Sequence, residues 1–75
     1  MKIIKNWLFI NHLWLDAKPC PIALNLNNVT QITEECDREF GGNHVVIYTN
    51  DGKSVPVEGE LIEVLALLQD HLSNN

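Results

Sequence analysis

The fold is decided by the stretch from Pro21 to Val57, which begins P-I-A-L-N-L-N-N-V-T-Q-I-T and, after an acidic segment, ends H-V-V-I-Y-T-N-D-G-K-S-V-P-V. Short runs of branched and aromatic residues alternate there with turn-forming residues, a pattern typical of an antiparallel sheet. Asn50-Asp51-Gly52 is the strongest local signal, because glycine supplies the positive φ of a tight hairpin turn. The stretch therefore predicts strands over residues 22–26, 29–35, 44–49 and 53–57.

Turn-forming residues set the connections between these strands. The three asparagines within residues 25–28 predict a tight turn or a single 3₁₀ turn, because asparagine tolerates left-handed backbone and bonds its own main chain. The acidic segment 34–42 ends in two glycines and predicts a hairpin loop. Residues 16–21 contain two prolines, which cannot donate to a strand ladder, so we expect a loop there. Pro56 predicts an edge strand or the end of strand pairing.

A fifth strand is predicted over residues 7–15, a run rich in aromatic and branched side chains that contains no glycine or proline. Successive side chains of a strand point to opposite faces, so Trp7 and Phe9 are expected on one face and Trp14 on the other. Both faces are apolar, and one helix can cover only one face of so small a sheet. We therefore expect one tryptophan at an interface or a ligand site. The alternative is that a bend or bulge in the strand buries both.

The segment 60–72 predicts a helix with an acidic first turn, which suits the positive end of the helix dipole. One stripe of this helix is apolar and is expected to pack on the sheet: Leu61, Val64, Leu65, Leu68 and Leu72. Ile62 and Leu67 fall outside the stripe on opposite flanks, which favours self-association. The expected fold is one α+β domain of residues 1–75, a small antiparallel sheet of four or five strands with a C-terminal helix on one face.

Length and charge limit the function. A chain of 75 residues buries a thin core, and its net charge of −5 leaves few cations for phosphates, so duplex nucleic acid and anionic membranes are not expected partners. The apolar N-terminal run is too short to span a bilayer and has no small-residue cleavage site, so a cytoplasmic protein is expected. Cys20 and Cys36 are expected to be free thiols in that compartment, with a bridge between them left open.

No catalytic, metal or cofactor signature is present in the sequence. The histidines and cysteines fall in separate predicted elements without zinc-site spacing: His12, His44, His71, Cys20 and Cys36. Cys36 and His44 could be imagined as nucleophile and base across a hairpin, but no motif supplies an orienting group or an oxyanion hole. We therefore expect neither a metal site, nor a cofactor, nor an enzyme.

Three motifs carry a family resemblance. They are P-I-A-L-N-x-x-x-V-x-x-I from Pro21, V-x-I-x-T-N-D-G-K-x-x-x-V from Val45 and E-V-L-A-L-L from Glu63, which together cover Pro21 to Leu68. In these motifs the chain resembles the small FlbD-type proteins of flagellar operons and their phage and bacterial relatives. The resemblance implies short strands, a hairpin closed by N-G or D-G and a C-terminal helix. It implies no catalytic residues.

The functional hypothesis is a non-catalytic, homo-oligomeric binding or regulatory protein that acts through protein–protein contacts. The alternative is a phage-encoded sequestering protein that holds a small nucleotide-type ligand at a subunit interface and so inhibits host defence signalling. Surplus aromatic and amide side chains support both, because they can stack on and hydrogen-bond a partner. The residues predicted to contact the ligand or partner are Trp7, Phe9, Trp14, Tyr48, Asn25, Arg38, Ile62 and Leu67.

Overall fold

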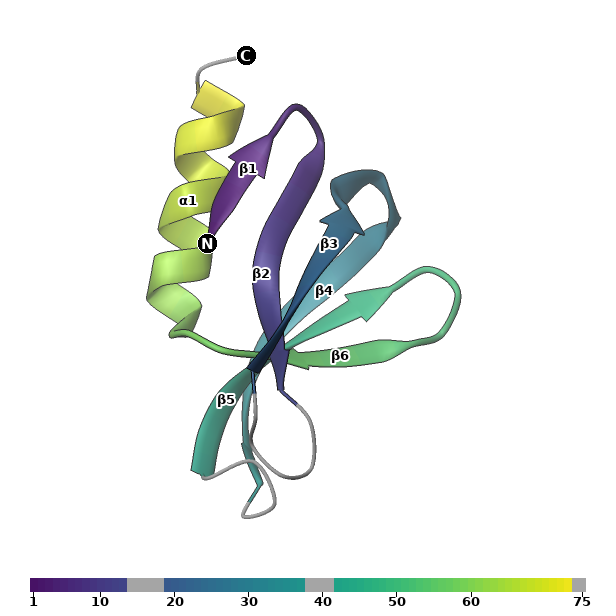
Figure 1. The fold of residues 1–75 in the computed structure, drawn as a ribbon, viewed down its shortest axis with the longest axis vertical. Coiled ribbons are helices and arrows are strands. Elements are labelled where there is room, and N and C mark those ends of the chain that lie inside the picture. The colour runs from purple at the N-terminus through teal and green to yellow at the C-terminus, as the bar shows by residue number, and fades with distance from the viewer. Residues whose placement is uncertain (14–18, 38–41, 74–75) are drawn as a thin grey trace.

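The structure is a computed structural model that describes residues 1–13, 19–37 and 42–73. It contains six strands, one 3₁₀ turn and one helix (Figure 1). They are β1 (Lys2–Ile4), β2 (Trp7–Leu13), β3 (Pro19–Asn25), η1 (Leu26–Asn28), β4 (Val29–Asp37), β5 (Gly42–Thr49), β6 (Ser54–Val57) and α1 (Leu61–Ser73). All paired strands are antiparallel and α1 packs against the sheet, so the predicted α+β class is confirmed.

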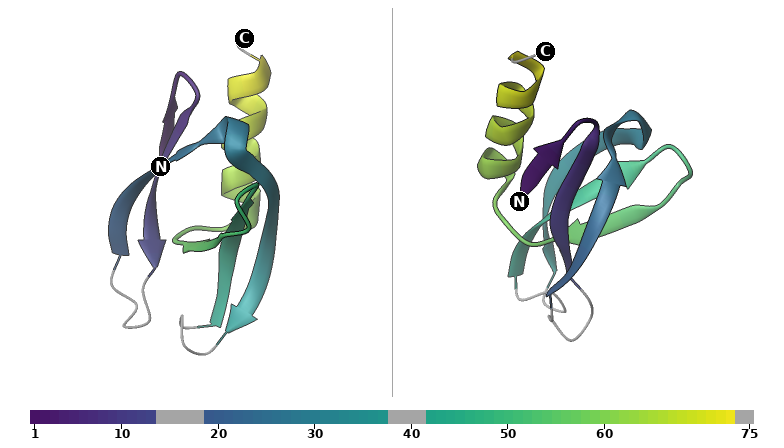
Figure 2. Two further views of the ribbon diagram at one scale, coloured as in Figure 1. Left: turned by 90° about the vertical axis from the view of Figure 1, so that its right-hand side faces the viewer. Right: turned by 45° about the horizontal axis from the view of Figure 1, so that its top comes forward.

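The sheet consists of two halves that meet at one point. β1, β2 and β3 form one half, β4, β5 and β6 form the other, and the strand order is β1-β2-β6-β5-β4 with β3 on the free side of β2. The halves are joined by the pair His12–Val57 and by the Glu58 N–H, which donates to the Asn11 carbonyl at 2.8 Å. The left view of Figure 2 shows the halves facing each other across the core.

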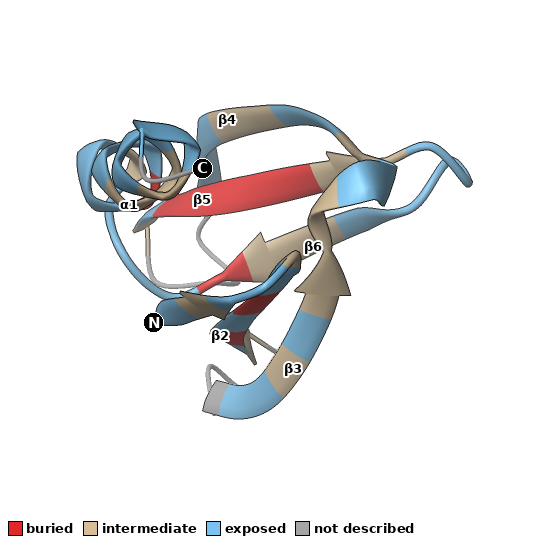
Figure 3. Cartoon of the chain, turned by 90° about the horizontal axis from the view of Figure 1, so that it is seen from above, coloured by how far each residue is buried: buried red, intermediate tan, exposed pale blue. Residues whose placement is uncertain are grey.

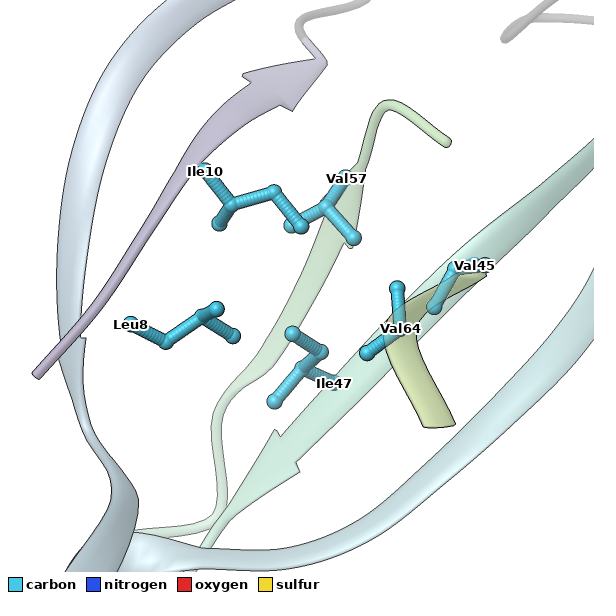
Figure 4. Close-up of a cluster of buried hydrophobic side chains, with 6 residues drawn as sticks. All are labelled: Leu8, Ile10, Val45, Ile47, Val57 and Val64. Carbon is cyan, nitrogen blue, oxygen red and sulfur yellow. The ribbon is translucent and has the colours of Figure 1, made fainter. Parts of the chain in front are cut away.

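The core lies between these halves and α1. Its buried side chains come from four elements and converge in Figure 4: Leu8, Ile10, Val45, Ile47, Val57 and Val64. Seen from above, burial is most continuous along β5 and reaches the parts of β2 and β6 that face it (Figure 3). The alternation of buried Leu8 and Ile10 with exposed Trp7 and Phe9 follows the two-residue period of β2.

The helix packs on the face centred at Val64, which is its one buried residue. At about 100° per residue, Leu67 lies about 60° to one side of Val64, Leu61 and Leu68 lie within about 60° on the other, and Leu65 lies about 100° away. Leu61, Leu67 and Leu68 pack on the core, whereas Leu65 and Leu72 are exposed. The predicted sheet-facing stripe was therefore wrong for Leu65 and Leu72, and Leu67 was wrongly placed outside it.

The sequence analysis did not predict β1. This strand pairs with β2, with Ile4 opposite Trp7, and is followed by the two-residue turn Lys5–Asn6. Lys5 adopts left-handed backbone with φ +55°, which is uncommon for a residue with a side chain. The turn contains no glycine and β1 has only three residues, so neither gave a local signal. The count of four or five strands is accordingly corrected to six.

The loop predicted over residues 16–21 differs from the structure, because Pro19 and Pro21 both lie in β3. The Asn11 carbonyl is directed at Glu58 on the β6 side of β2, so the pair Asn11–Pro21 is of the non-hydrogen-bonded kind. The nitrogen of Pro21, which carries no proton, therefore faces the free edge of β3, where no ladder bond is lost. Pro19 has the same position two residues earlier in the register.

Two local predictions are confirmed. Gly52 has φ +84° in the hairpin between β5 and β6, and its N–H donates to the Thr49 carbonyl at 3.1 Å. The asparagine-rich segment forms η1, as expected. The acidic segment differs, because its first four residues continue β4 opposite β5, with Glu35 paired to His44. Cys20 and Cys36 are free and exposed.

Candidate interaction surface

The outward side of β1 and β2 carries an exposed apolar surface, which we call the sheet face and define as Ile4, Trp7 and Phe9. Trp7 is 46% exposed although it stands at the start of a paired strand. Ile4 lies directly opposite Trp7 on β1, so the two side chains share this side of the sheet. Lys2 lies opposite Phe9 in the same way and is exposed. The sheet face is therefore an apolar patch with a cation in its own row.

A cavity of about 310 Å³ opens beside the sheet face, between β3 and the β5–β6 hairpin. Trp7, Asn25 and Asn28 line one side, and Asp51 and Lys53 line the hairpin side. The structure thus brings Trp7 and Asn25 together, as two of the predicted contact residues. The Lys53 ammonium lies 3.9 Å from the Asp51 carboxylate, so this side of the cavity carries one charge of each sign, both largely exposed to solvent.

Asn25 also has a structural role at this cavity. Its Oδ1 accepts from the Asn27 N–H at 3.0 Å, which caps η1, and from Nδ2 of Asn6 at 3.1 Å. These bonds tie the turn after β1 to the turn after β3. The Leu26 N–H adds a third tie, to the Asn6 carbonyl at 2.9 Å. Asn25 is therefore held in place by the fold before any ligand arrives.

The second exposed apolar surface lies on α1, and we call it the helix stripe: Ile62, Leu65 and Leu72. Ile62 is 72% exposed and Leu65 is 48% exposed. With Gln69, these residues have the spacing three, four, three, which keeps them on one side of a helix. That side adjoins the core-facing side rather than lying opposite it, because the stripe is centred roughly 120° round the helix from Val64 and begins next to Leu68. Ile62 was predicted to be exposed, and it is.

Tyr48 lies on the outer side of β4, β5 and β6, apart from the sheet face. Its hydroxyl donates to Oε2 of Glu35, which also accepts from the Thr33 hydroxyl at 2.8 Å. The Tyr48 bond, followed by the Thr33 bond, lowers the pKa of Glu35, because both stabilise the carboxylate. The same bond to Glu35 raises the pKa of Tyr48, because it is lost when the phenol ionises. We assign Tyr48, Glu35 and Thr33 a structural role within the sheet, because they lie apart from the sheet face.

Tyr48 is the one tyrosine of the chain, so its titration can be read directly. The absorbance of the phenolate near 295 nm should titrate above the ordinary tyrosine pKa in the native protein, and Glu35→Gln should bring the midpoint down. The bond stabilises the fold while Glu35 is ionised and Tyr48 is protonated. Its contribution should therefore disappear as pH falls through the lowered Glu35 pKa, and again as pH rises through the raised Tyr48 pKa. An unchanged midpoint in Glu35→Gln would contradict the assignment.

The remaining predicted contact residues are distributed as follows. Leu67 packs on the core, which removes the reason for placing it at a contact surface. Trp14 and Arg38 lie outside the described residues. Cys36 is paired with Asn43, and His44 is paired with Glu35, so the side chains of Cys36 and His44 point to opposite faces of the sheet. Both residues line one cavity of about 270 Å³, but the register does not direct the Cys36 and His44 side chains at each other.

Within residues 1–13, 19–37 and 42–73, no three histidine, cysteine or acidic side chains gather as a metal ion would require. The described part of the chain also has no helix that is both long and apolar enough to cross a membrane. No family model, curated protein or solved structure matches the chain, so the resemblance to FlbD-type proteins stays a prediction.

Sequence reasoning missed Lys2 beside the sheet face, and Ile4, Leu65 and Leu72 within the two apolar surfaces. The first two belong to β1, which was not predicted. The other two were assigned to the buried side of α1. The available signal was the three, four, three spacing of Ile62, Leu65, Gln69 and Leu72, which competes in the sequence with the stripe through Leu61, Val64 and Leu68.

Proposed function

We propose that this protein is a non-catalytic binding module that self-associates and exerts a regulatory effect through protein–protein contacts. The observation that carries the proposal is the sheet face, where Trp7 and its neighbour Ile4 are about half exposed on paired strands. Tryptophan is enriched among the residues that dominate binding energy at interfaces. A surface of this kind is costly to leave in water and gains free energy when another surface covers it.

The size of the domain supports self-association as the form of this contact. A domain of 75 residues buries a smaller fraction of its surface on folding than a larger domain does, and seven hydrophobic residues are buried in the described part of this chain. Covering the sheet face and the helix stripe would extend that core between chains. In the oligomer, the residues that are exposed in one chain would therefore be buried between chains.

The test is the solution mass of the unmodified protein between about 1 and 100 µM, by light scattering and sedimentation. We expect a mass that rises with concentration above that of one 8.5 kDa chain. A strict monomer throughout this range would overturn the proposal.

A second candidate function is sequestration of a small nucleotide-type ligand. The cavity beside Trp7 favours it, because an aromatic ring and two amide side chains can stack on and hydrogen-bond a base. Asp51 opposes it, since its carboxylate lies on the same cavity and would repel a phosphate. A base or nucleoside part would therefore supply most of the binding.

A thermal-shift panel of nucleosides, nucleotides and cyclic dinucleotides tests this second function. Ligand at about 100 times its Kd stabilises by about 2.7 kcal/mol, which is on the order of 10 °C or more for a domain of this size. Lys53→Gln should change the response to nucleotides more than the response to nucleosides, because only nucleotides bring phosphate to the hairpin. No stabilisation across the panel would remove this candidate.

A further inference from the structure

The strand β4 has one free edge. It pairs with β5 on one side and with no described strand on the other, and the left view of Figure 2 shows it along the outside of its half of the sheet. The other exposed edges of the described sheet are poor templates for a further strand. β1 has only three residues, and prolines without an N–H face the uncovered sides of β3 and β6: Pro19, Pro21 and Pro56. β4 has nine residues and no proline.

The hairpin between β5 and β6 determines which backbone groups of β4 face this edge. The Thr49 N–H donates to the Lys53 carbonyl at 3.0 Å, so the backbone groups of Thr49 are directed at β6 and those of Tyr48 at β4. Tyr48 pairs with Gln31, so every second residue of β4 from Gln31 onward bonds β5. The residues between them direct their N–H and C=O groups at the free edge: Ile32, Glu34 and Cys36.

Glu34 and Glu35 give the edge a negative charge. Both side chains are exposed and point to opposite faces of the sheet, and β4 contains no lysine, arginine or histidine. The hydroxyls of Tyr48 and Thr33 donate to Glu35 and hold its carboxylate in place. Full antiparallel pairing of this edge with the same edge of a second copy would put the two Glu34 side chains directly opposite each other, which is unfavourable. The edge therefore disfavours a second copy and favours a strand that carries cations.

We propose that the free edge of β4 binds an extended segment of another protein as an added strand, with two adjacent lysine or arginine residues opposite Glu34 and Glu35. Backbone hydrogen bonds along the edge supply affinity, and the two cations supply selectivity. Ile32 is half-buried and packs on the core, so an apolar residue of the segment fits opposite it. This edge contact rests on the proposed action through protein–protein contacts, and it uses a surface apart from the sheet face.

The probe is the end-capped hexapeptide Val-Thr-Lys-Lys-Thr-Val, whose sequence reads the same in both directions and so fits β4 in either orientation. Its Kd is measured by NMR titration of the labelled protein up to about 5 mM peptide. Peptide at about ten times its Kd should slow hydrogen exchange of the Ile32, Glu34 and Cys36 amides about tenfold, because they exchange only while the edge is free. The amides of Gln31 and Thr33, which bond β5, are internal controls.

Glu34→Pro removes an N–H from the free edge and none from the ladder with β5, so the fold should tolerate it. It should weaken peptide binding at least about tenfold, through loss of a backbone hydrogen bond and of the charge. Glu34→Gln keeps the N–H and should weaken binding only about threefold. Unchanged affinity in Glu34→Pro would show that the edge is not the site. If circular dichroism shows that Glu34→Pro is unfolded, the exchange pattern of the unmodified chain decides.

A second peptide, with glutamate in place of both lysines, should not bind. Slower exchange confined to the three edge amides, seen with the lysine peptide only, would support the edge contact. No binding of the lysine peptide, equal binding of both peptides, or slower exchange centred on the sheet face would overturn it. Edge amides that are protected without peptide and exchange faster on dilution would show that a second copy occupies the edge, which also overturns it. Solution mass tests self-association separately, so either idea can fail while the other stands.

Discussion

Ile47→Ala should destabilise the domain by about 2–5 kcal/mol, because it removes a large, fully buried side chain and leaves a cavity. Ile47 lies in β5, the middle strand of its half of the sheet, opposite Ile32 on β4 and Val55 on β6, so neighbouring strands hold the cavity open. A chain of 75 residues has a total stability of roughly 4–11 kcal/mol. The substitution should therefore remove a large part of it and lower the urea midpoint accordingly.

Ile62→Ala is the matched control, since it makes the same chemical change at a side chain that is 72% exposed. It should alter the unfolding free energy by no more than about 0.5 kcal/mol, and alanine's helix propensity favours a slight gain. Both variants should be measured where the chains are monomeric, because association would add to the apparent stability. Comparable losses in the two variants would contradict the position of the core.

Trp7→Ala should weaken self-association by roughly 30-fold or more, the effect of about 2 kcal/mol that is usual for a tryptophan at the centre of an interface. The loss arises because the truncated side chain no longer covers apolar surface on the next copy. It should be seen as a shift of the concentration at which the mass rises, and mainly as faster dissociation. Trp7→Phe, which keeps an aromatic ring, should retain part of the affinity.

Gln31→Ala serves as the control for Trp7→Ala, because Gln31 is exposed on β4 and belongs to neither apolar surface. It should leave the association unchanged. The unfolding free energy of Trp7→Ala must be recorded as well, so that loss of contact is separated from loss of fold. If Trp7→Ala associates like the unmodified protein, the sheet face has no part in the contact.

The parts of the fold that local sequence determines were predictable. The turn at Gly52 needs a positive φ, and the alternation of Val45 and Ile47 with their neighbours is the period of a strand. β1 was not predictable in this way, because three residues form a strand only when β2 is beside them. Pro21 similarly fits β3 only because its nitrogen faces the free edge, which depends on the register of two strands.

The two candidate surfaces were likewise predictable where local sequence determines them and not where contacts between elements do. Exposure of Trp7 follows from the two-residue period of β2 and from the need to bury Leu8. The exposed side of α1 was predicted only in part, since Leu65 and Leu67 are equally apolar in the sequence. Their roles are set by where the helix touches the sheet, and that contact centres on Val64. Periodicity identifies two apolar sides of the helix, but packing against the sheet determines which of them is buried.

The two halves of the described sheet are joined by one strand pair, His12–Val57, and this also affects the order of folding. Within each half, the strands pair with their neighbours in sequence, so those ladders close short loops. The pair His12–Val57 closes a much longer one, and its entropy must be recovered mainly by packing of Leu8 and Ile10 on the other half. Each half can therefore form its ladders early, with docking of the two as the step that commits the chain to the native state.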